Sequence, residues 1–331
     1  HVQVNGHSSA VRDVLFGSPQ GAVLSPLIFT IFVADLPLWT NHSSLYSYAD
    51  DTTTNVRHGD LQEVKRMAEE DAKKILAFLN SNFLVANTEK TKVLLFRWRE
   101  GADDEPNSPF SIEVGGSEIK ESESEKLLGM HLSNNLRWDR HITEVKTSVN
   151  QRLAILRHVS YFIPQESLRE LAFGLVLSKI RYGIPVYGTV RLGDEDPHNK
   201  GMQSLEVSIN DAMRIVNRSS RIDRISINQL RANTKIPSVN QMIAEATLLE
   251  TWRIRMLRND SDLIKPITSS GMLTRCQAMG NLEVPMGGQE KRTSFSVQAP
   301  KLWNAAPTGL RTCVGKGSAK KIIKLFAASL P

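Results

Sequence analysis

The chain has 331 residues, 40% of them hydrophobic, an ordinary globular composition that can bury a core, and its length suggests two or three domains. The net charge of +6 hides an asymmetry, because residues 1–138 carry 13 basic and 19 acidic side chains while residues 139–331 carry 28 and 16. The acidic half could bind cations; the basic half either binds polyanions or is a solvated helix surface. Cys276 and Cys313 have no CxxC or nearby histidine pattern, which excludes a disulfide framework and a zinc site and favours a reducing, intracellular setting.

The N-terminus has no initiator Met and no signal-peptide core, so it looks like the cut end of a longer chain, and we expect a protein that is not secreted. The longest apolar run, Leu27 to Leu38, is too short to span a membrane and contains Asp35 and Pro37. Val2–Val4, the turn Asn5-Gly6 and the apolar run Val11–Phe16 predict an opening hairpin.

A glycine-bounded loop follows, with the sequence Gly17-Ser18-Pro19-Gln20-Gly21-Ala22-Val23-Leu24-Ser25-Pro26. Ser25 is expected to cap a helix from Pro26 to about Asp35 that is apolar nearly all round and therefore buried. Two glycines permit a close backbone approach to a nucleotide or template, although the loop could equally be a strand-to-helix connector.

Two carboxylates, Asp50 and Asp51, stand at the tip of a predicted hairpin formed by Leu45–Ala49 and Thr52–Val56. Because side chains alternate along a strand, we expect Asp50 to share a face with Tyr46 and Tyr48 and Asp51 to point to the other side. Such a pair could hold a hard divalent cation such as Mg²⁺, or it could be a solvated turn.

An amphipathic helix is predicted over Leu61 to Phe83, and its charged face is most simply a solvated surface. It is followed by a turn at Asn87–Thr91 that contains Lys90, a strand at Val93–Phe96, a hairpin at Phe110–Lys120 and a strand at Leu127–Leu132. The spacing of His131 and His141 does not fit one helix turn, so we interpret both as structural or phosphate-facing.

Helices replace strands after Asp139, and a loop at Leu192–Gly201 marks a domain boundary. The periodicity predicts helices over Ile142–Val159, Gln165–Arg181, Met202–Val216, Ser238–Leu257 and, in the basic tail, Lys316–Leu330. Basic side chains on the first helix and between the third and fourth are candidate phosphate contacts: Lys146, Arg152, Arg157, Arg214, Arg218, Arg221, Arg224 and Arg231.

The order and spacing of the glycine loop, Ala34-Asp35-Leu36-Pro37 and Tyr48-Ala49-Asp50-Asp51-Thr52 resemble the palm of reverse transcriptases of non-LTR, LINE-type retrotransposons. The segment Lys126–Ile142 is similar to the primer grip of that family. The resemblance implies an α+β fold, with an incomplete palm of antiparallel strands and packed helices in residues 1–132. A helical thumb in 133–190 and a basic, mainly helical C-terminal region in 191–331 would follow.

The resemblance also implies RNA-directed DNA polymerase activity with Mg²⁺ or Mn²⁺, in which Asp50 has the main metal role and Asp51 a supporting one. Lys90 would face the triphosphate, although taken singly it could equally be a surface lysine in a turn. Nucleotide and template would contact the following residues: Gly17, Ser18, Pro19, Gln20, Gly21, Tyr48 and Ala49. The partners implied are template RNA, a DNA primer and deoxynucleoside triphosphates, with no membrane, and the reaction would take place in the nucleus at the site of integration.

The chain departs from the family in one important respect, because no residue can stand for the first metal-binding aspartate upstream of the glycine loop. Asp13 lies too near the loop, and Asp35 is expected on the buried helix. The fingers and endonuclease parts are also missing, so we expect no polymerase activity from these 331 residues alone. A catalytically dead nucleic-acid-binding relic and a metal-dependent phosphodiesterase using the same acids remain as alternatives.

Overall fold

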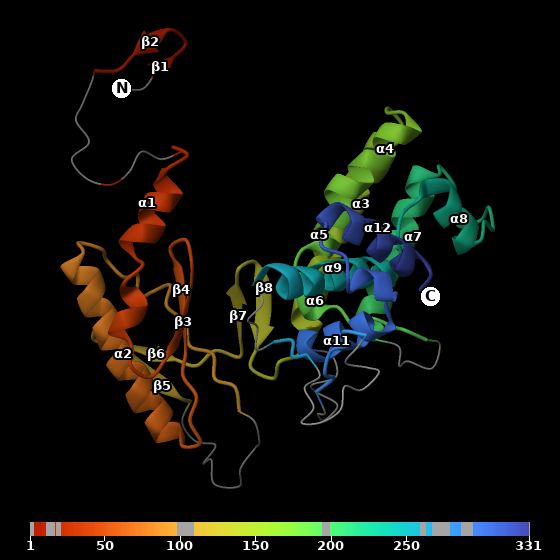
Figure 1. The fold of residues 1–331 in the computed structure, drawn as a ribbon. Coiled ribbons are helices and arrows are strands. Elements are labelled where there is room, and N and C mark those ends of the chain that lie inside the picture. The colour runs from red at the N-terminus through yellow and green to blue at the C-terminus, as the bar shows by residue number, and fades with distance from the viewer. Residues whose placement is uncertain are drawn as a thin grey trace. The chain divides into compact units, whose positions relative to one another are not determined.

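The computed structural model describes residues 3–10, 17, 21–97, 109–193, 199–258, 263–266, 279–285 and 294–330 (Figure 1). The chain divides into two compact units, His1–Glu125 and Lys126–Pro331. Small antiparallel strand pairs and packed helices confirm the predicted α+β class. Among the described residues, no helix has both the length and the apolar character needed to cross a membrane.

The first unit contains three helical elements and three two-stranded antiparallel sheets within the described residues. The helical elements are α1 (Ser25–Phe32), the 3-10 helix η1 (Leu36–Trp39) and α2 (Leu61–Ser81), and the strands are β1 (Gln3–Val4), β2 (His7–Ser8), β3 (Ser44–Tyr48), β4 (Asp51–Asn55), β5 (Ser111–Val114) and β6 (Ser117–Lys120). Asn5 and Gly6 both have positive φ between β1 and β2, which confirms the predicted turn, whereas Val11–Phe16 lie outside the described residues.

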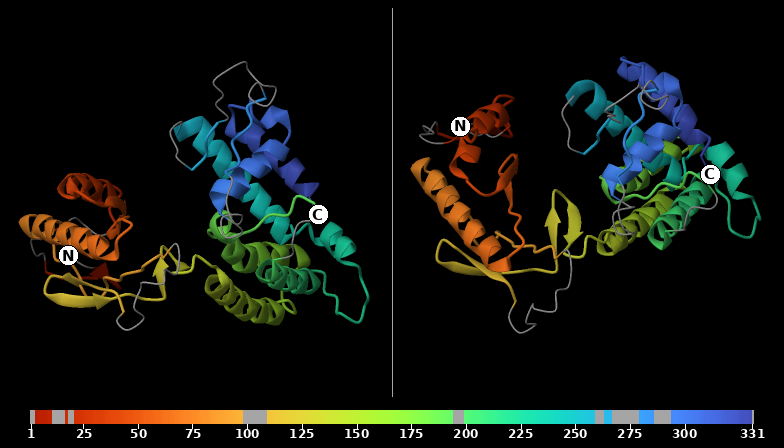
Figure 2. Two further views of the ribbon diagram at one scale, coloured as in Figure 1. Left: turned by 90° about the horizontal axis from the view of Figure 1, so that it is seen from below. Right: turned by 60° about the horizontal axis from the view of Figure 1, so that its bottom comes forward.

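Helix α2 is the scaffold of the first unit and confirms the predicted amphipathic helix. Asp60 caps its N-terminus by accepting a hydrogen bond from the Gln62 backbone N–H, and Phe78 is buried on its inner face. It packs against η1 and β5, and Figure 2 shows it lying alongside the hairpin β5–β6. Its outer face carries ion pairs three or four residues apart, as expected for a solvated surface.

The prediction that the helix after the glycine loop is buried is wrong. Helix α1 has no buried residue, and its apolar side chains Leu27, Ile28 and Ile31 are 57%, 54% and 67% exposed. An apolar helix is buried only where another element covers it, and none of the described strands or helices does so here. The helix also begins at Ser25, with Leu24 in the cap position, so Ser25 is not its N-cap.

Three further expectations for the first unit and the junction that follows it need correction. The helix ends at Phe32, so Asp35 lies in an exposed turn before η1 rather than on a buried helix. Val93 forms a single parallel bridge with Glu121 instead of the predicted strand at Val93–Phe96. The predicted strand at Leu127–Leu132 is a hairpin of β7 (Ser124–Leu127) and β8 (Met130–Ser133), because Leu128 and Gly129 both adopt positive φ and turn the chain.

The second unit, apart from β8 and the end of β7, is helical in its described residues. Its elements are α3 (Asp139–Val159), α4 (Gln165–Ala172), the π-helix η2 (Phe173–Leu177), α5 (Ser178–Arg181), α6 (Ile184–Tyr187), α7 (Lys200–Val216), α8 (Ile227–Thr234), α9 (Val239–Arg253), the π-helix η3 (Ile254–Arg258), α11 (Phe295–Ala305), the 3-10 helix η5 (Thr308–Leu310) and α12 (Lys316–Ala328). Buried residues at three- to four-residue spacing on α3, from Ile142 to Leu156, pack along α7. The helices predicted over residues 142–159, 165–181, 202–216 and 316–330 are therefore confirmed, with η2 inside the second.

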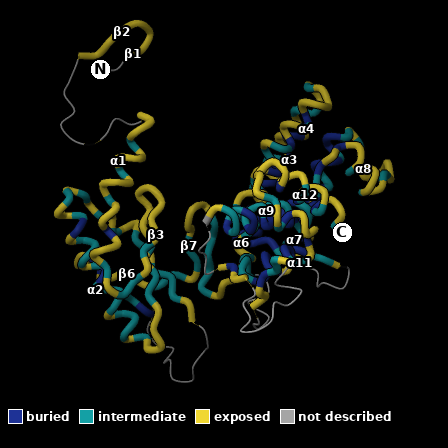
Figure 3. The backbone as a smooth tube through the Cα atoms, in the orientation of Figure 1, coloured by how far each residue is buried: buried dark blue, intermediate teal, exposed yellow. Residues whose placement is uncertain are grey.

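Helix α9 lies at the centre of the second unit and contacts α6, α7, α11 and α12. Ser238 and Gln241 form a reciprocal capping box at its N-terminus. Trp252 is 2% exposed and donates a hydrogen bond from Nε1 to the Cys313 carbonyl at 2.7 Å. Figure 3 shows the buried residues gathered on these central helices, whereas the first unit has few.

Candidate active site

The two aspartates of the candidate site lie at the exposed tip of the hairpin β3–β4. The register pairs Tyr48 with Asp51, and the two-residue turn between them is Ala49-Asp50, with φ of 54° at Ala49. Directly opposed residues project to the same face, so Asp51, not Asp50, lies on the tyrosine face. The predicted facing was wrong because Asp50 is a turn residue, to which strand alternation does not apply.

The carboxylates of Asp50 and Asp51 suit a hard divalent cation, since carboxylate oxygens are the ligands that Mg²⁺ and Mn²⁺ prefer. Both side chains are exposed, and neither forms an ion pair within the described part of the chain. In that same part no group of three or more His, Cys, Asp or Glu side chains converges on a metal-sized site. The donor type therefore fits, and further ligands would have to come from outside the described residues or from a bound substrate.

The predicted nucleotide-facing loop is described only at its ends, Gly17 and Gly21, which have φ of 82° and 83°. A side chain is strained in this left-handed region, so the backbone explains the glycine at both positions. Apart from the chain neighbours, no atom of the described residues lies within 4 Å of where a Cβ would stand at either glycine. Ser18, Pro19 and Gln20 lie outside the described residues, as does Asp13.

Lys90 lies in the predicted turn, which the structure confirms. Its backbone N–H donates to the carbonyl and the side-chain Oδ1 of Asn87, at 3.2 and 3.1 Å, and Thr91 Oγ1 donates to the same carbonyl. The Lys90 side chain is exposed. Among the described residues it forms no ion pair with either aspartate, so the structure positions its backbone and leaves its ammonium group available.

Asp71 is a structural residue of the candidate site region that the sequence did not reveal. It is 1% exposed on α2 and accepts hydrogen bonds from the backbone N–H groups of Asn41, His42 and Ser43 at 2.7–3.0 Å. Burial alone would raise its pKa, but these N–H donors outweigh burial and hold the pKa of Asp71 below its usual range. Asp71 thereby fixes the segment that enters strand β3. One signal in the sequence could have indicated that Asp71 is buried: it lies four residues before Ile75, on the apolar side of the helix.

His131 and His141 form a buried contact at the start of α3. His141 Nδ1 lies 3.3 Å from the His131 backbone N–H, and His131 Nε2 lies 2.7 Å from Glu144. His141 is 3% exposed, packs edge-on against Tyr187, and has its pKa lowered chiefly by burial. The structural reading of His141 is confirmed.

Six of the eight candidate phosphate contacts divide into two groups. Lys146 and Arg157 are exposed on α3, and their side chains form no ion pair or hydrogen bond with a described residue. The other four are held by the protein: Arg152 by the Leu175 carbonyl, Arg214 by the Ser220 carbonyl, Arg218 by the Ile163 carbonyl and Arg221 by the Asp211 carboxylate. Of the two further arginines, Arg231 pairs with Glu206, and Arg224 is exposed with φ of 51°.

An exposed aromatic pair, which the sequence analysis did not single out, lies at the turn between α3 and α4. Tyr161 and Phe162 are 80% and 76% exposed, and we call them the aromatic corner. The guanidinium of Arg218 donates to the neighbouring Ile163 carbonyl at 2.7 Å and holds this turn against the end of α7. The exposed Arg157 lies one helical turn before it. Such a combination of rings and cation suits stacking against unpaired bases.

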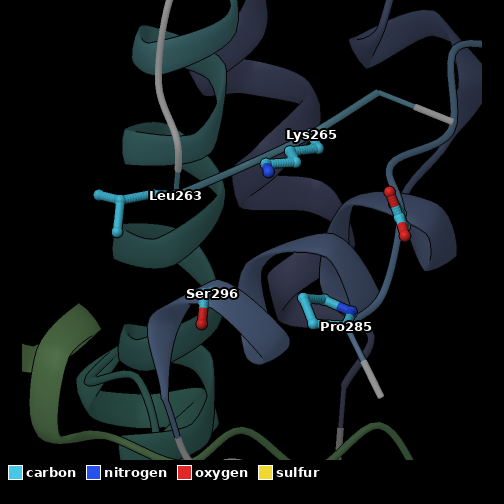
Figure 4. A pocket seen from close by; sticks show the side chains of 5 residues that line it. Leu263, Lys265, Pro285 and Ser296 are labelled. Carbon is cyan, nitrogen blue, oxygen red and sulfur yellow. The ribbon is translucent and has the colours of Figure 1, made fainter. Parts of the chain in front are cut away.

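A cavity of about 330 Å³ lies in the second unit, away from the aspartates in the sequence. Figure 4 shows Leu263, Lys265, Pro285 and Ser296 around it, and Glu283 completes its lining. The Glu283 backbone N–H donates to the Lys265 carbonyl at 2.9 Å, so the two chain segments that form the walls are joined. Its lining contains none of the predicted site residues.

Residues 2–132 match the family described as reverse transcriptase (RNA-dependent DNA polymerase). The match ends at Leu132, so it shows similarity to the family for this part of the chain. The match places the hairpin with Asp50 and Asp51, the glycine loop and Lys90 inside the reverse transcriptase region, and it confirms the resemblance to LINE-type, non-LTR reverse transcriptases.

The chain is similar to proteins from mobile elements of fruit flies. It is 25% identical to the RNA-directed DNA polymerase from mobile element jockey of Drosophila melanogaster over 57% of the chain and 21% of that protein. It is 24% identical to the probable RNA-directed DNA polymerase from transposon BS over 84% of the chain and 30% of that protein. The chain thus spans less than a third of the length of these relatives. No solved structure matches it significantly.

Proposed function

We propose that the chain supplies the metal-binding hairpin, thumb and C-terminal region of an RNA-directed DNA polymerase from a non-LTR retrotransposon. The observation that carries the proposal is the exposed pair Asp50 and Asp51 at the hairpin tip, in the segment that matches the reverse transcriptase family. In this proposal residues 1–132 are part of the palm, 133–190 the thumb and 191–331 the C-terminal region.

The chemistry follows from what each group can do. Asp50, with Asp51 in support, would hold Mg²⁺ or Mn²⁺. When bound, two such ions neutralise charge on the attacking and leaving oxygens of nucleotidyl transfer. The backbone at Gly17 and Gly21 would lie against nucleotide and template, and the exposed Lys90 would place a cation near the leaving group. Template RNA, a DNA primer and deoxynucleoside triphosphates are the proposed partners, and integration places the reaction in the nucleus.

The proposed activity requires more ligands than the described residues provide. Two carboxylates from one hairpin leave most of the coordination of two metal ions to water and phosphate, so we propose that these 331 residues alone do not extend a primer. The first unit would become competent when an upstream strand adds a third carboxylate.

Primer extension tests the function. A DNA primer annealed to template RNA is incubated with Mg²⁺ and deoxynucleoside triphosphates, with this chain and with the gene product extended upstream. Extension by the longer product only, reduced to background by Asp50→Asn, is the expected result. Extension by the 331-residue chain itself that Asp50→Asn abolishes would contradict the proposed dependence on an upstream ligand.

A nucleic-acid-binding relic without catalysis is the second candidate, and the free cations Lys146 and Arg157 together with the aromatic corner favour it. It predicts salt-dependent RNA binding that Asp50→Asn leaves unchanged, and no extension by the longer gene product. Extension by that product is the observation that separates the two candidates.

A further inference from the structure

Helix α12 is held firmly to the second unit by its inner face. Ala319, Ile323 and Ala327 are at most 3% exposed and pack on α9. At one end Trp252 Nε1 donates to the Cys313 carbonyl at 2.7 Å, and at the other Gln241 Nε2 donates to the Ala328 carbonyl at 3.5 Å. The two helices are therefore antiparallel, and α12 presents its outer face in a fixed position.

Four exposed lysines lie along one side of α12, and we call them the lysine face: Lys316, Lys320, Lys321 and Lys324. All four are exposed, and none of their ammonium groups forms an ion pair or hydrogen bond with any residue that the structure describes. Residues 291–331 contain eight Lys or Arg and no Asp or Glu. The charge of the lysine face is thus not neutralised within the tail of the chain.

The lysine face differs from the paired lysines on the surface of α2. On α2, Lys65 and Lys74 each lie within 4 Å of a glutamate one turn away. On α12 the pairs Lys316–Lys320 and Lys320–Lys324 bring like charges to that same spacing, which destabilises the helix. Lys316 is also in the first turn, where the helix dipole disfavours a cation. The lysines of this face therefore reduce the stability of the helix that carries them. A sequence feature that lowers stability in this way indicates a functional role.

We propose that the lysine face binds the phosphate backbone of nucleic acid, at a site additional to the hairpin tip. Successive lysines at four-residue spacing are about 6 Å apart along the helix, whereas a duplex presents one charge per about 1.7 Å of its axis, so several phosphates come within reach. Lysine contacts a phosphate as a point charge and reads no base, so the binding is independent of sequence.

A membrane surface fits the lysine face less well than nucleic acid. An interfacial helix inserts its apolar face among lipid chains, but the apolar face of α12 is buried against α9. Leu325 is the one large apolar side chain that the described α12 exposes. The remaining attraction is electrostatic, and the proposed reaction already brings RNA and DNA to this chain.

The test is the salt dependence of binding to a fluorescent RNA–DNA hybrid of about 20 base pairs, measured by anisotropy with the whole 331-residue chain. In the variant Lys316→Gln/Lys320→Gln/Lys321→Gln/Lys324→Gln, the slope of log K against log salt should fall in magnitude by about 3, since each lost contact removes about 0.7–0.9. Affinity at low salt should fall more than tenfold. An unchanged slope and affinity would overturn the proposal.

Two matched variants control for charge and for folding. Replacing the four lysines by arginine should keep the slope, and Lys65→Gln/Lys74→Gln on α2 should leave it unchanged because those lysines are already paired. The smaller variant Lys320→Gln/Lys324→Gln should show about half the change in slope. It is used in place of the fourfold variant if the fourfold variant has a lowered Tm.

Two further measurements separate this proposal from its alternatives. The first is binding to phosphatidylserine vesicles. If the fourfold variant loses this binding but still binds the RNA–DNA hybrid, the proposal that the lysine face binds nucleic acid is overturned in favour of a membrane surface. Asp50→Asn should leave hybrid binding unchanged, so the lysine face and the polymerase assignment can fail independently.

Discussion

Tyr48 and Asp51 are cross-strand partners at the tip of hairpin β3–β4, with only Ala49 and Asp50 between them. Directly opposed side chains share a face, so Asp51 projects to the same side of the hairpin as Tyr48, a residue that is 70% exposed. Asp50 projects from the turn itself. The two acids therefore reach the tip from different backbone positions, and a ligand held by Asp51 also meets the tyrosine.

Divalent cations should bind at this tip even in the isolated chain. Mn²⁺ is expected to broaden the NMR signals of the residues around Asp50 and Asp51, since carboxylates are its preferred ligands. Asp50→Asn/Asp51→Asn should remove the broadening, because an amide carries no charge. Asp60→Asn, in an exposed helix cap, is the matched control and should leave it unchanged. Equal broadening in the double variant and the parent chain would exclude a metal role for the pair.

The hairpin, the turn at Lys90 and most helices could be predicted because each depends on local sequence: alternation, capping residues and three- to four-residue spacing. The side of the hairpin to which Asp50 projects could not be predicted. It depends on whether Asp50 belongs to the turn or to a strand, and an alanine such as Ala49 does not indicate the positive φ that it adopts in this turn. The exposure of α1 could not be predicted either, since burial depends on what covers a helix and not on its own composition.

The candidate nucleic-acid contacts also separate into what the sequence could predict and what only the fold decides. Arg152, Arg214 and Arg218 were chosen for their charge, but each donates to a main-chain carbonyl, a geometry that only the fold decides. Asp71 went unnoticed because its three donors lie about 30 residues away in the sequence. The lysine face was visible as a basic helix, whereas its lack of described partners required the structure.

Removing the Asp71 carboxylate should destabilise the first unit. Asp71→Ala leaves three backbone N–H groups without their acceptor and is expected to cost on the order of 3 kcal/mol, measured by amide hydrogen exchange in α2. Glu63→Ala removes an exposed acid of the same helix and is expected to cost less than about 0.5 kcal/mol. Similar losses in the two variants would contradict the structural role of Asp71.

The stabilisation of the first unit by the Asp71 carboxylate should be lost in acid. The folded pKa of Asp71 lies below the unfolded value of about 3.9, so its stabilisation is fully present above that value. It is lost as the pH falls through the folded pKa, where the carboxyl is protonated in both states. The difference between the parent chain and Asp71→Ala should therefore shrink only in strong acid. A difference that already shrinks between about pH 7 and 5 would contradict this assignment.

Phe83 should be replaceable by glycine with a gain in stability. It ends α2 with φ of 57° while its side chain is 96% exposed, so the strained backbone is not repaid by packing. Phe83→Gly should stabilise the first unit by about 0.5–1 kcal/mol, measured by urea denaturation. Phe83→Ala keeps the strain and should change little. A gain for alanine equal to that for glycine would trace the effect to the lost ring and not to the backbone.

The aromatic corner should bind unpaired bases. Tyr161→Ala/Phe162→Ala removes two exposed rings and is expected to weaken binding of single-stranded RNA at least about tenfold, because stacking contributes about 1–3 kcal/mol per base. The slope of log K against log salt should stay the same, since no charge is removed, and this distinguishes the corner from the lysine face. Ile222→Ala, which removes an aliphatic side chain that is 87% exposed, should leave the affinity unchanged. Equal weakening by both variants would show that exposed apolar area, and not stacking, retains the RNA.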